Sequence, residues 1–307
     1  MDRFLLMHCY TRAVETGSFS AVARELGIGQ PNVSRHIAAL EQHLGTRLLH
    51  RSTRKLTQTP EGERYYVEAR RVLDAVTEAE SNARGEDTPS GLLRIACPTA
   101  LARSYVMPHV KSLLSLYPEM DLELQVSDRF IDLVEEGVDL AIRIGTLKDS
   151  ALKARRIGTA ERICVASPAY LASRPAPKSP EQLQRHDCIV YTLLSAGNTW
   201  SFKQSEIEVN GRFRVNTPDG VYRAAIDGLG VAYAPVWLFQ EALMNGKLVP
   251  LLVGHLGSPT PINIVYSARR LLPRRATVFM DFIAKEFSHT QELTEGAVER
   301  LLRKRRR

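Results

Sequence analysis

The chain of 307 residues has few cysteines and no long apolar segment. Its four cysteines, Cys9, Cys97, Cys164 and Cys188, stand far apart, and none forms a pair at the spacing of metal ligands. We therefore expect free thiols in a reducing cytoplasm, with neither a metal nor a cofactor. The first residues predict an amphipathic helix instead of a secretory signal, and no apolar run is long enough to cross a bilayer. These absences predict a cytoplasmic protein with no membrane partner.

Catalytic motifs are missing as well. The sequence contains no Gly-x-Ser-x-Gly elbow, no phosphate-binding glycine-rich loop and no His-Glu-x-x-His. Gly228-Leu229-Gly230 precedes an expected strand instead of following one, so it fails as a dinucleotide-binding fingerprint. We therefore expect no enzymatic activity, and turnover of a substrate by the purified protein would overturn this expectation.

Positive charge is concentrated at the two ends of the chain. The net charge is +7. Residues 1–58 carry eight Lys or Arg against four Asp or Glu, and residues 303–307 are all basic. Such a distribution favours a polyanionic partner at the N-terminal end. For the C-terminal tail, the alternative is a solvated, disordered end with no fixed partner.

The N-terminal residues predict three helices. The first covers residues 2–15, with Phe4, Met7, Tyr10 and Val14 expected to face the other two. Phe19, Val22, Ala23 and Leu26 recur at helical spacing before Gly27, a helix-ending residue. A short turn leads to Pro31, which suits the first turn of a new helix, and there one apolar stripe is formed by Val33, Ile37, Leu40 and Leu44.

Two helices joined by so short a turn have the shape of a helix-turn-helix. The second helix of that motif enters the DNA major groove, roughly 12 Å wide, with its N-terminal residues against the base edges. Ordinary helical bundles also produce this pattern. If the partner is double-stranded DNA, the candidates for base recognition are Gln30, Pro31, Asn32, Ser34, Arg35 and His36.

Residues 46–59 alternate in polarity around a charged turn and predict a small two-stranded wing. Phosphate contacts fix the register and the affinity of a protein on DNA without reading its sequence. The candidates for such contacts are Ser20, Arg51, Arg54 and Lys55. The alternative is an exposed hairpin with solvated charges.

A long helix is expected from Pro60 to about Ala83. Apolar residues recur along it at steps of four and three, which is a coiled-coil seam. The seam residues are Tyr65, Ala69, Val72, Val76 and Ala79. The simplest partner for such a seam is the same helix of a second copy, which predicts a homodimer. The alternative is burial against a later domain of the same chain.

After a hinge at residues 85–91, expected strands and helices alternate, including a helix over residues 130–136. This alternation predicts α/β structure with mostly parallel sheets. In such sheets ligands lie at the carboxyl ends of strands, near helix N-termini. The loops at those positions contain Pro98, Thr99, Ala100, Ser127, Asp128, Arg143, Gly145, Asn216 and Thr217. Each has a structural alternative: Thr99 could merely cap its helix, and Arg143 could pair with Asp128.

Several motifs resemble the LysR-type transcriptional regulators. In the head they are Ser18-Phe19-Ser20-Ala21-Val22-Ala23, Gln30-Pro31-Asn32-Val33-Ser34, Leu40-Glu41 and Leu44-Gly45. Later they are residues 132–137, 139–145, 166–171 and 228–232. The chain departs from the family pattern at Val22, Gly29 and Leu49, and Gly29 removes a hydroxyl that could cap the helix or contact a phosphate.

This resemblance implies an all-α winged helix-turn-helix domain at 1–59, a linker helix through which two subunits dimerise at 60–84, and a hinge at 85–91. It implies an effector-binding domain at 92–302, similar to periplasmic solute-binding proteins. Lobe I is expected at 92–161 and 268–302, lobe II at 162–267, and a basic tail at 303–307. The two crossovers between the lobes are expected near 156–162 and 266–269.

The resemblance also implies that the ligand loops face one another across a cleft, where a small organic anion would bind as the effector. Asp219 is expected close to that anion and would repel it unless it caps its own helix. Pairing of dimers into a tetramer is expected, and contact with RNA polymerase is possible. Two further alternatives remain. An exported solute-binding protein would need a signal peptide, and an architectural DNA binder would lack a small-molecule response.

Overall fold

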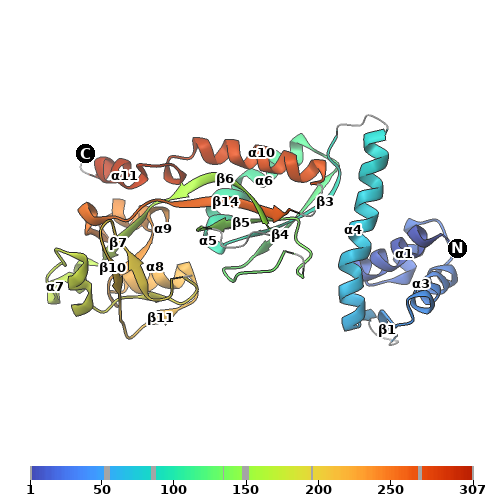
Figure 1. Ribbon diagram of the computed structural model, residues 1–307, viewed down its shortest axis with the longest axis horizontal. Helices are drawn as coiled ribbons and strands as arrows, with labels where there is room; N and C mark the ends of the chain where they lie inside the picture. Colours follow the sequence, from blue (N-terminus) through green and yellow to red (C-terminus); the bar gives the residue numbers. More distant parts are fainter. Residues whose placement is uncertain are drawn as a thin grey trace. The chain divides into compact units, whose positions relative to one another are not determined.

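A computed structural model describes residues 2–51, 56–83, 88–133, 135–146, 152–194, 196–268 and 272–305. The chain divides into two compact units, shown in Figure 1: Met1–Gly91 with Val134–Gly137, and Leu92–Leu133 with Val138–Arg307. Within the described ranges, every helix is too short or too polar to cross a membrane.

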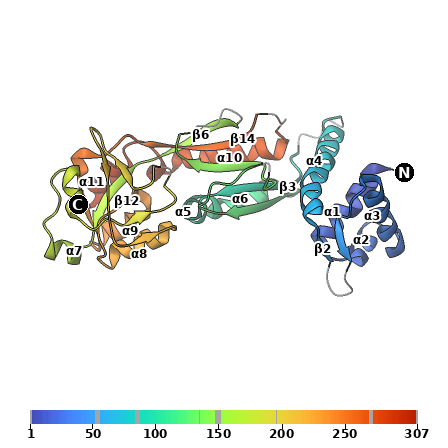
Figure 2. The ribbon, with the colours of Figure 1, turned by 60° about the horizontal axis from the view of Figure 1, so that its bottom comes forward.

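The N-terminal unit consists of a helical head, a small hairpin and a long helix (Figure 2). Its helices are α1 (Arg3–Thr16), α2 (Phe19–Glu25), α3 (Gln30–Leu44) and α4 (Pro60–Ala83). The hairpin pairs β1 (Leu49–Arg51) and β2 (Leu56–Gln58) in antiparallel fashion, as the wing pattern predicted.

The core of the head differs from the prediction at two positions. In α1 the buried face is formed by Leu6, Cys9, Tyr10 and Ala13, whereas Phe4 is 48% exposed. Phe4 lies in the first turn of α1, outside the i, i+3, i+4, i+7 set that packs under α3. In α3, Val33, Ile37 and Leu40 are buried, but Leu44 in the last turn is exposed.

Local sequence explains the tight turn between α2 and α3. Ser18 caps α2 by accepting a hydrogen bond from the backbone N–H of Ala21 at 3.3 Å. Gly27 follows the helix with a φ of 64°, a left-handed conformation that favours glycine. Pro31 then lies in the first turn of α3, where its missing N–H has no intrahelical partner to lose.

The start of α4 is packed tightly against the head. Thr59 caps the helix by accepting a hydrogen bond from the N–H of Gly62 at 3.0 Å. The hydroxyl of Tyr10 donates to the carbonyl of Gly62 at 2.8 Å. A Cβ atom on Gly62 would lie 2.1 Å from the carbonyl oxygen of Leu48, so no larger residue fits without displacement. The linker helix is therefore fixed to the head at its first turn.

The second unit contains a five-stranded sheet in the order β4-β3-β5-β14-β6. Its strands are β3 (Gly91–Cys97), β4 (Met120–Val126), β5 (Leu140–Ile144), β6 (Leu152–Ala160) and β14 (Thr260–Ser267). The helices that pack on this sheet are α5 (Thr99–Leu101), the π-helical turn η1 (Ala102–Val106), α6 (Met107–Leu116) and α10 (Arg274–His289). We call this part lobe I.

A smaller three-stranded sheet, in the order β12-β7-β13, forms the centre of lobe II. Its strands are β7 (Arg162–Ala166), β12 (Ala232–Pro235) and β13 (Val249–Leu251). Around it lie α7 (Pro168–Ser173), η2 (Pro180–Arg185), α8 (Pro218–Ile226), α9 (Val236–Met244), η3 (Val253–His255) and the short strands β8 (Val190–Tyr191), β9 (Thr199–Ser201), β10 (Glu206–Glu208) and β11 (Arg214–Val215). The chain continues through η4 (Gln291–Leu293) and α11 (Ala297–Arg305).

The predicted α/β class is confirmed, but the sheets are mixed instead of mostly parallel. β3 and β5 are parallel, whereas β14 runs antiparallel to both β5 and β6. In lobe II, both β12 and β13 run antiparallel to β7. The expected helix over residues 130–136 was wrong, because the described residues there form turns and irregular backbone. Asp128, which could cap a helix there, instead accepts a hydrogen bond from the N–H of Thr99 at 2.9 Å.

Two predicted boundaries are also corrected. The return crossover was expected at 266–269, but Thr260 already pairs with Ala160 and Ser267 with Leu152. The chain therefore re-enters the lobe I sheet by Thr260, because β14 pairs along the whole length of β6. The basic tail expected at 303–307 begins inside a helix, since α11 extends to Arg305.

Candidate DNA-binding and effector sites

The N-terminal turn of α3 presents polar side chains that are preorganised by contacts with one another. Arg35 Nη2 donates to Asn32 Oδ1 at 2.5 Å, and Ser20 Oγ donates to Gln30 Oε1 at 3.1 Å. Gln30, Pro31 and Arg35 are exposed, whereas Asn32 and Ser34 are half-buried. Asn, Gln and Arg side chains can each hydrogen-bond a base with two atoms. This turn is therefore chemically suited to reading base edges.

His36 lies differently from the other predicted base contacts. Its Nδ1 atom is buried, and no hydrogen-bond partner for it occurs among the described residues. Apart from Nδ1, the half-exposed ring of His36 is accessible at the surface. In the wing, the side chain of Arg51 and all of Arg54 and Lys55 lie outside the described residues.

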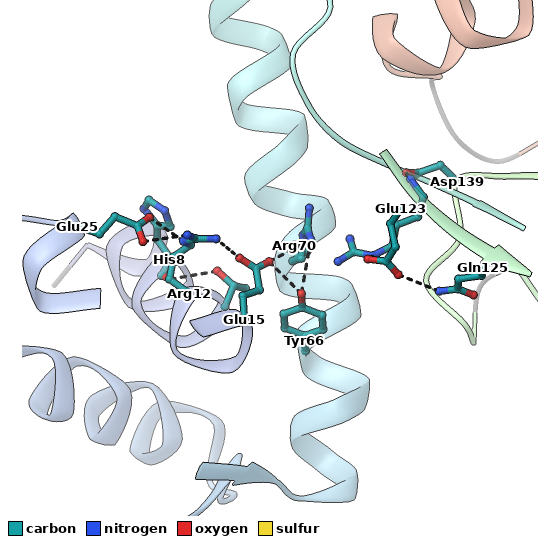
Figure 3. Close-up of polar contacts among 11 residues, drawn as sticks. His8, Arg12, Glu15, Glu25, Tyr66, Arg70, Glu123, Gln125 and Asp139 are labelled. Atoms are coloured by element: carbon teal, nitrogen blue, oxygen red, sulfur yellow. Dashed lines mark hydrogen bonds and ion pairs between the residues drawn. The ribbon is translucent and has the colours of Figure 1, made fainter. Parts of the chain in front are cut away.

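An ion-pair network joins two helices of the head to the linker helix (Figure 3). Arg12 of α1 pairs with Glu25 of α2 through Nε at 2.7 Å and Nη2 at 2.9 Å, and it also contacts Glu15. The Oε1 atom of Glu15 accepts from Tyr66 Oη at 2.9 Å and from Arg70 Nη1 at 3.0 Å, both on α4. The chain of contacts therefore runs from the linker helix through α1 to the first helix of the helix-turn-helix.

The network is partly shielded from water. The side chains of Glu15 and Arg70 are 23% and 12% exposed. The hydrogen bond from Arg12 lowers the pKa of Glu25, and Glu25 in turn raises the pKa of Arg12. Charged hydrogen bonds of this kind hold helices in a defined orientation more strongly than exposed pairs do.

The predicted dimer seam of α4 is divided between two environments. Ala69 is 1% exposed, and the Tyr65 ring packs against Tyr10 with centroids 5.7 Å apart. Tyr65 therefore contacts the head of the same chain, and Ala69 is already buried within one chain, so their assignment to a free dimer surface was wrong. Val72 is 40% exposed, Val76 is half-buried and Ala79 is exposed.

In lobe I, two predicted ligand loops contact each other. The backbone N–H of Thr99 donates to Asp128 Oδ1 at 2.9 Å, and Ser127 Oγ accepts from the N–H of Arg129 at 3.2 Å. Burial raises the pKa of Tyr191 in lobe II to about 12, and the charge of Asp128 contributes to this shift.

Arg143, the predicted counter-charge for an anion, is engaged elsewhere. Its Nη2 atom donates to the carbonyl of Ile131 at 2.6 Å, and its guanidinium lies 3.7 Å from the centroid of the exposed Phe130 ring. A cation on an aromatic face is stabilised by the ring quadrupole. These contacts hold the Arg143 side chain against the loop that follows β4.

A different arginine bridges the lobes. Arg103 in η1 donates from Nη1 and Nη2 to the two carboxylate oxygens of Asp219 at the start of α8, at 3.0 and 2.9 Å. Both side chains are more than half exposed and so accessible from solution. Sequence reasoning missed Arg103, because the π-helical turn that carries it has no readable signal. Asp219 was expected to repel an anion, but here it is paired.

Three of the remaining predicted ligand residues make contacts within the protein. Thr217 caps α8 by accepting from the N–H of Gly220 at 3.2 Å. The carbonyl of Gly145 accepts from Asn263 Nδ2 at 3.2 Å, and the carbonyl of Pro98 accepts from the N–H of Ala102 at 2.8 Å. Ala100 is buried and Asn216 is exposed, so only the latter offers a side chain to a ligand.

All four cysteines are free and buried. Burial raises the pKa of Cys188 to about 12 and also raises the pKa values of Cys9, Cys97 and Cys164. Within the described ranges, no three His, Cys, Asp or Glu residues gather in a way that could hold a metal ion.

Comparison with known proteins agrees with both parts of this description. The profile of the bacterial regulatory helix-turn-helix protein, lysR family, matches residues 5–63, and that of the LysR substrate binding domain matches residues 86–288. The HTH-type transcriptional regulator YhjC of Escherichia coli K12 is 34% identical over 92% of this chain and 97% of its own length. CrgA of Neisseria meningitidis serogroup C is 32% identical over 91% and 95%.

Solved structures give the same result. The structure of CrgA, described as a LysR-type transcriptional regulator, has a TM-score of 0.59 at 32% identity, covering 92% of this chain and 97% of that one. The full-length structure of AphB, a virulence activator of Vibrio cholerae, has a TM-score of 0.56 at 31% identity, covering 93% and 99%. The chain therefore belongs to the LysR family: it is a DNA-binding transcriptional regulator with a substrate-binding domain, and not an enzyme.

Proposed function

We propose that this regulator binds an interrupted palindrome as a dimer, reads base edges with the first turn of α3, and responds to a small organic anion bound between the lobes. The domains would be the winged head at 1–59, the linker helix at 60–84 and the substrate-binding domain after the hinge at 85–91. Binding to chromosomal DNA would place the protein in the cytoplasm.

The observation that carries the DNA-binding part is the paired arrangement of Asn32 and Arg35 on the exposed start of α3. Bidentate contacts to adenine or guanine need such side chains held in a fixed orientation. Gln30 and Ser34 would complete the base contacts, and Ser20, Arg51, Arg54 and Lys55 would bind phosphates.

The free part of the linker helix supports dimerisation. Val72, Val76 and Ala79 lie at steps of four and three on α4 and are at least partly exposed within one chain. A second α4 would bury them in a coiled-coil seam. Two heads would then be joined at a fixed spacing, which suits two half-sites separated by whole turns of DNA. The proposal also includes the pairing of two such dimers into a tetramer and a contact with RNA polymerase.

The ion pair between Arg103 and Asp219 supports an anionic effector. A planar guanidinium binds a carboxylate with two hydrogen bonds, so the carboxylate of an effector can replace Asp219 on Arg103. The loops that carry Thr99, Ser127, Asp128 and Thr217 would supply further contacts to this effector. Exchange of one carboxylate for another would alter a contact between the lobes and shift their closure.

Footprinting of the purified protein on bacterial promoter DNA, with and without a panel of small carboxylic acids, tests the proposal. We expect protection of two half-sites and a change in its extent with one acid. The corresponding uncharged amide is the matched control for each acid, and Arg103→Gln should remove the response without removing the footprint. A response to the amide, or an unchanged response in Arg103→Gln, would contradict the anionic class and this contact.

A further inference from the structure

The last part of the chain forms an arm that begins in lobe I and ends on lobe II. The arm covers residues 290–305, which comprise η4 and α11, and it follows α10. In Figure 1, α10 runs along β6 and β14, and α11 continues to the side of lobe II. The family profile of the substrate-binding domain ends at residue 288, so the arm lies beyond it.

The first anchor of the arm is in the core of lobe I. Leu293 is fully buried there among residues of β6, β14 and α10. The carbonyl oxygen of Leu293 approaches β6 closely, because a Cβ atom on Gly158 would lie 3.1 Å from it. Full burial of a leucine side chain removes a large apolar surface from water, so this anchor is substantial.

The second anchor is in the core of lobe II. Ala297, Val298 and Leu301 of α11 are 3–7% exposed and pack with α9. Next to the first anchor, Gln240 Nε2 of α9 donates to Glu292 Oε1 of η4 at 3.1 Å. The arm therefore has an apolar contact with each lobe and crosses from one to the other.

A single carboxylate at the crossover holds the arm in place. Glu161 lies between β6 of lobe I and β7 of lobe II. Its Oε1 atom accepts from the N–H of Gly296 at 2.6 Å and its Oε2 atom accepts from the N–H of Val298 at 2.9 Å. The backbone carbonyl of Glu161 accepts from the N–H of Val236, where α9 begins, at 2.8 Å. One residue thus joins the crossover, α9 and the arm.

Arg300 shapes the turn that leads into α11. Its guanidinium donates to the carbonyl oxygens of Gln291, Thr294 and Glu295 and to the hydroxyl of Thr294, at 2.5–3.2 Å. These bonds tie η4 and the turn after it to the first turn of α11. The arm therefore has an ordered conformation of its own, independent of the contacts with Glu161.

We propose that this arm is a strap across the hinge, a third connection that restricts how far the two lobes rotate about their crossovers. Two extended crossovers alone act as a hinge, since a few residues can absorb the change in φ and ψ. A segment buried in both lobes must move or strain when they rotate. Glu161 is the positioning residue that fastens the strap at the hinge, and the strap sets the range of lobe closure.

The test measures lobe separation and strap attachment in the full-length protein. Spin labels are placed at Ser112→Cys on α6 and Ala172→Cys on α7, both exposed, while the four native cysteines are buried. Labelled protein is diluted with unlabelled protein so that distances between subunits do not contribute. Hydrogen exchange at residues 296–305 reports strap attachment. The variants are Glu161→Gln, Glu161→Ala and, as the matched control, Arg303→Ala, whose ion pair with Glu299 stays within α11.

We expect a narrow distribution of distances in the wild type and in Arg303→Ala. In Glu161→Ala, exchange at the start of α11 should accelerate about tenfold or more, since two hydrogen bonds to a charged group are lost, and the distances should broaden. Glu161→Gln keeps one acceptor oxygen, so its exchange rates and distances should lie between those of the wild type and of Glu161→Ala. Faster exchange with unchanged distances would show that the arm covers the surface without restricting the rotation of the lobes. Unchanged exchange in both Glu161 variants would show that the carboxylate does not hold the arm in place.

Discussion

The Oε1 atom of Glu15 lies 3.0 Å from Nη1 of Arg70, and this ion pair joins α1 to the linker helix. Because both side chains are largely shielded, we predict that Glu15→Ala and Arg70→Ala each lower the free energy of unfolding by about 1–3 kcal/mol. A double-mutant cycle in urea should give a coupling energy well above the error of the measurement. Arg64→Ala, which removes an exposed pair with Glu61 on the same helix, is the control and should cost almost nothing.

Base recognition is tested on α3. Replacing Asn32 or Arg35 by Ala should reduce discrimination between preferred and random DNA by about 1–3 kcal/mol, because a base contact of two hydrogen bonds is lost. Fluorescence anisotropy with both DNA sequences at one salt concentration measures the difference. Gln42→Ala, on an exposed position near the other end of the helix, should leave discrimination unchanged. An unaltered sequence preference in both variants would refute the assignment.

The close approach of Gly62 to Leu48 leads to a prediction about stability. In Gly62→Ala, the new methyl group would lie 2.1 Å from the backbone oxygen of Leu48, which also accepts a hydrogen bond from the N–H of Thr59 at 3.0 Å. We expect a loss of about 1–3 kcal/mol in the free energy of unfolding, the usual cost of overpacking. Gly254→Ala is the control, since nothing lies within 4 Å of its Cβ position. Equal stability of the two variants would show that the start of α4 can move.

A pH effect is expected from His186 in lobe II. Its Nδ1 atom lies 3.2 Å from the Tyr170 hydroxyl, which also accepts from the N–H of Asp187. Burial, and then the charge of Arg174, lower the pKa of His186 below its ordinary value of about 6.5. The unfolded chain therefore binds the proton more readily than the folded chain. The neutral His186 side chain contributes to the free energy of unfolding above pH 6.5, and this contribution is lost as the pH falls below it.

The measurement is urea unfolding at several pH values between about 5 and 8, covering the ordinary range of histidine titration. His186→Gln should show a weaker decline in stability toward low pH than the wild type. His289→Gln, at an exposed position on α10, should keep the decline of the wild type. The same pH dependence in all three proteins would contradict the role of His186.

The sequence predicted the helix-turn-helix, the wing and the linker helix because each depends on local periodicity and turn residues. It failed on the phase of α1, because Phe4, Leu5, Leu6 and Met7 form an uninterrupted apolar run that fits more than one buried face. Periodicity likewise identified the apolar seam of α4 but not the surface against which the seam packs. Tyr65 packs on the head of the same chain and Ala69 is buried within one chain, which spacing alone does not reveal.

The candidate effector contacts were harder to predict, because they depend on residues far apart in the chain. Arg103 and Asp219 are separated by 116 positions and meet only when both lobes have folded. The C-terminal helix was missed for another reason. Its basic residues were interpreted as a charged tail, although Ala297, Val298 and Leu301 have the spacing of one apolar helix face. That spacing is the signal that could have found it.

The most direct test of the central claim is selection of binding sites from a library of random double-stranded DNA by the full-length protein. We predict that the selected sequences contain two inverted half-sites whose centres are separated by whole helical turns, about 10 base pairs or a multiple of it. Selection of a single half-site, or no enrichment of any sequence over the starting library, would contradict a dimer that reads DNA through two copies of α3.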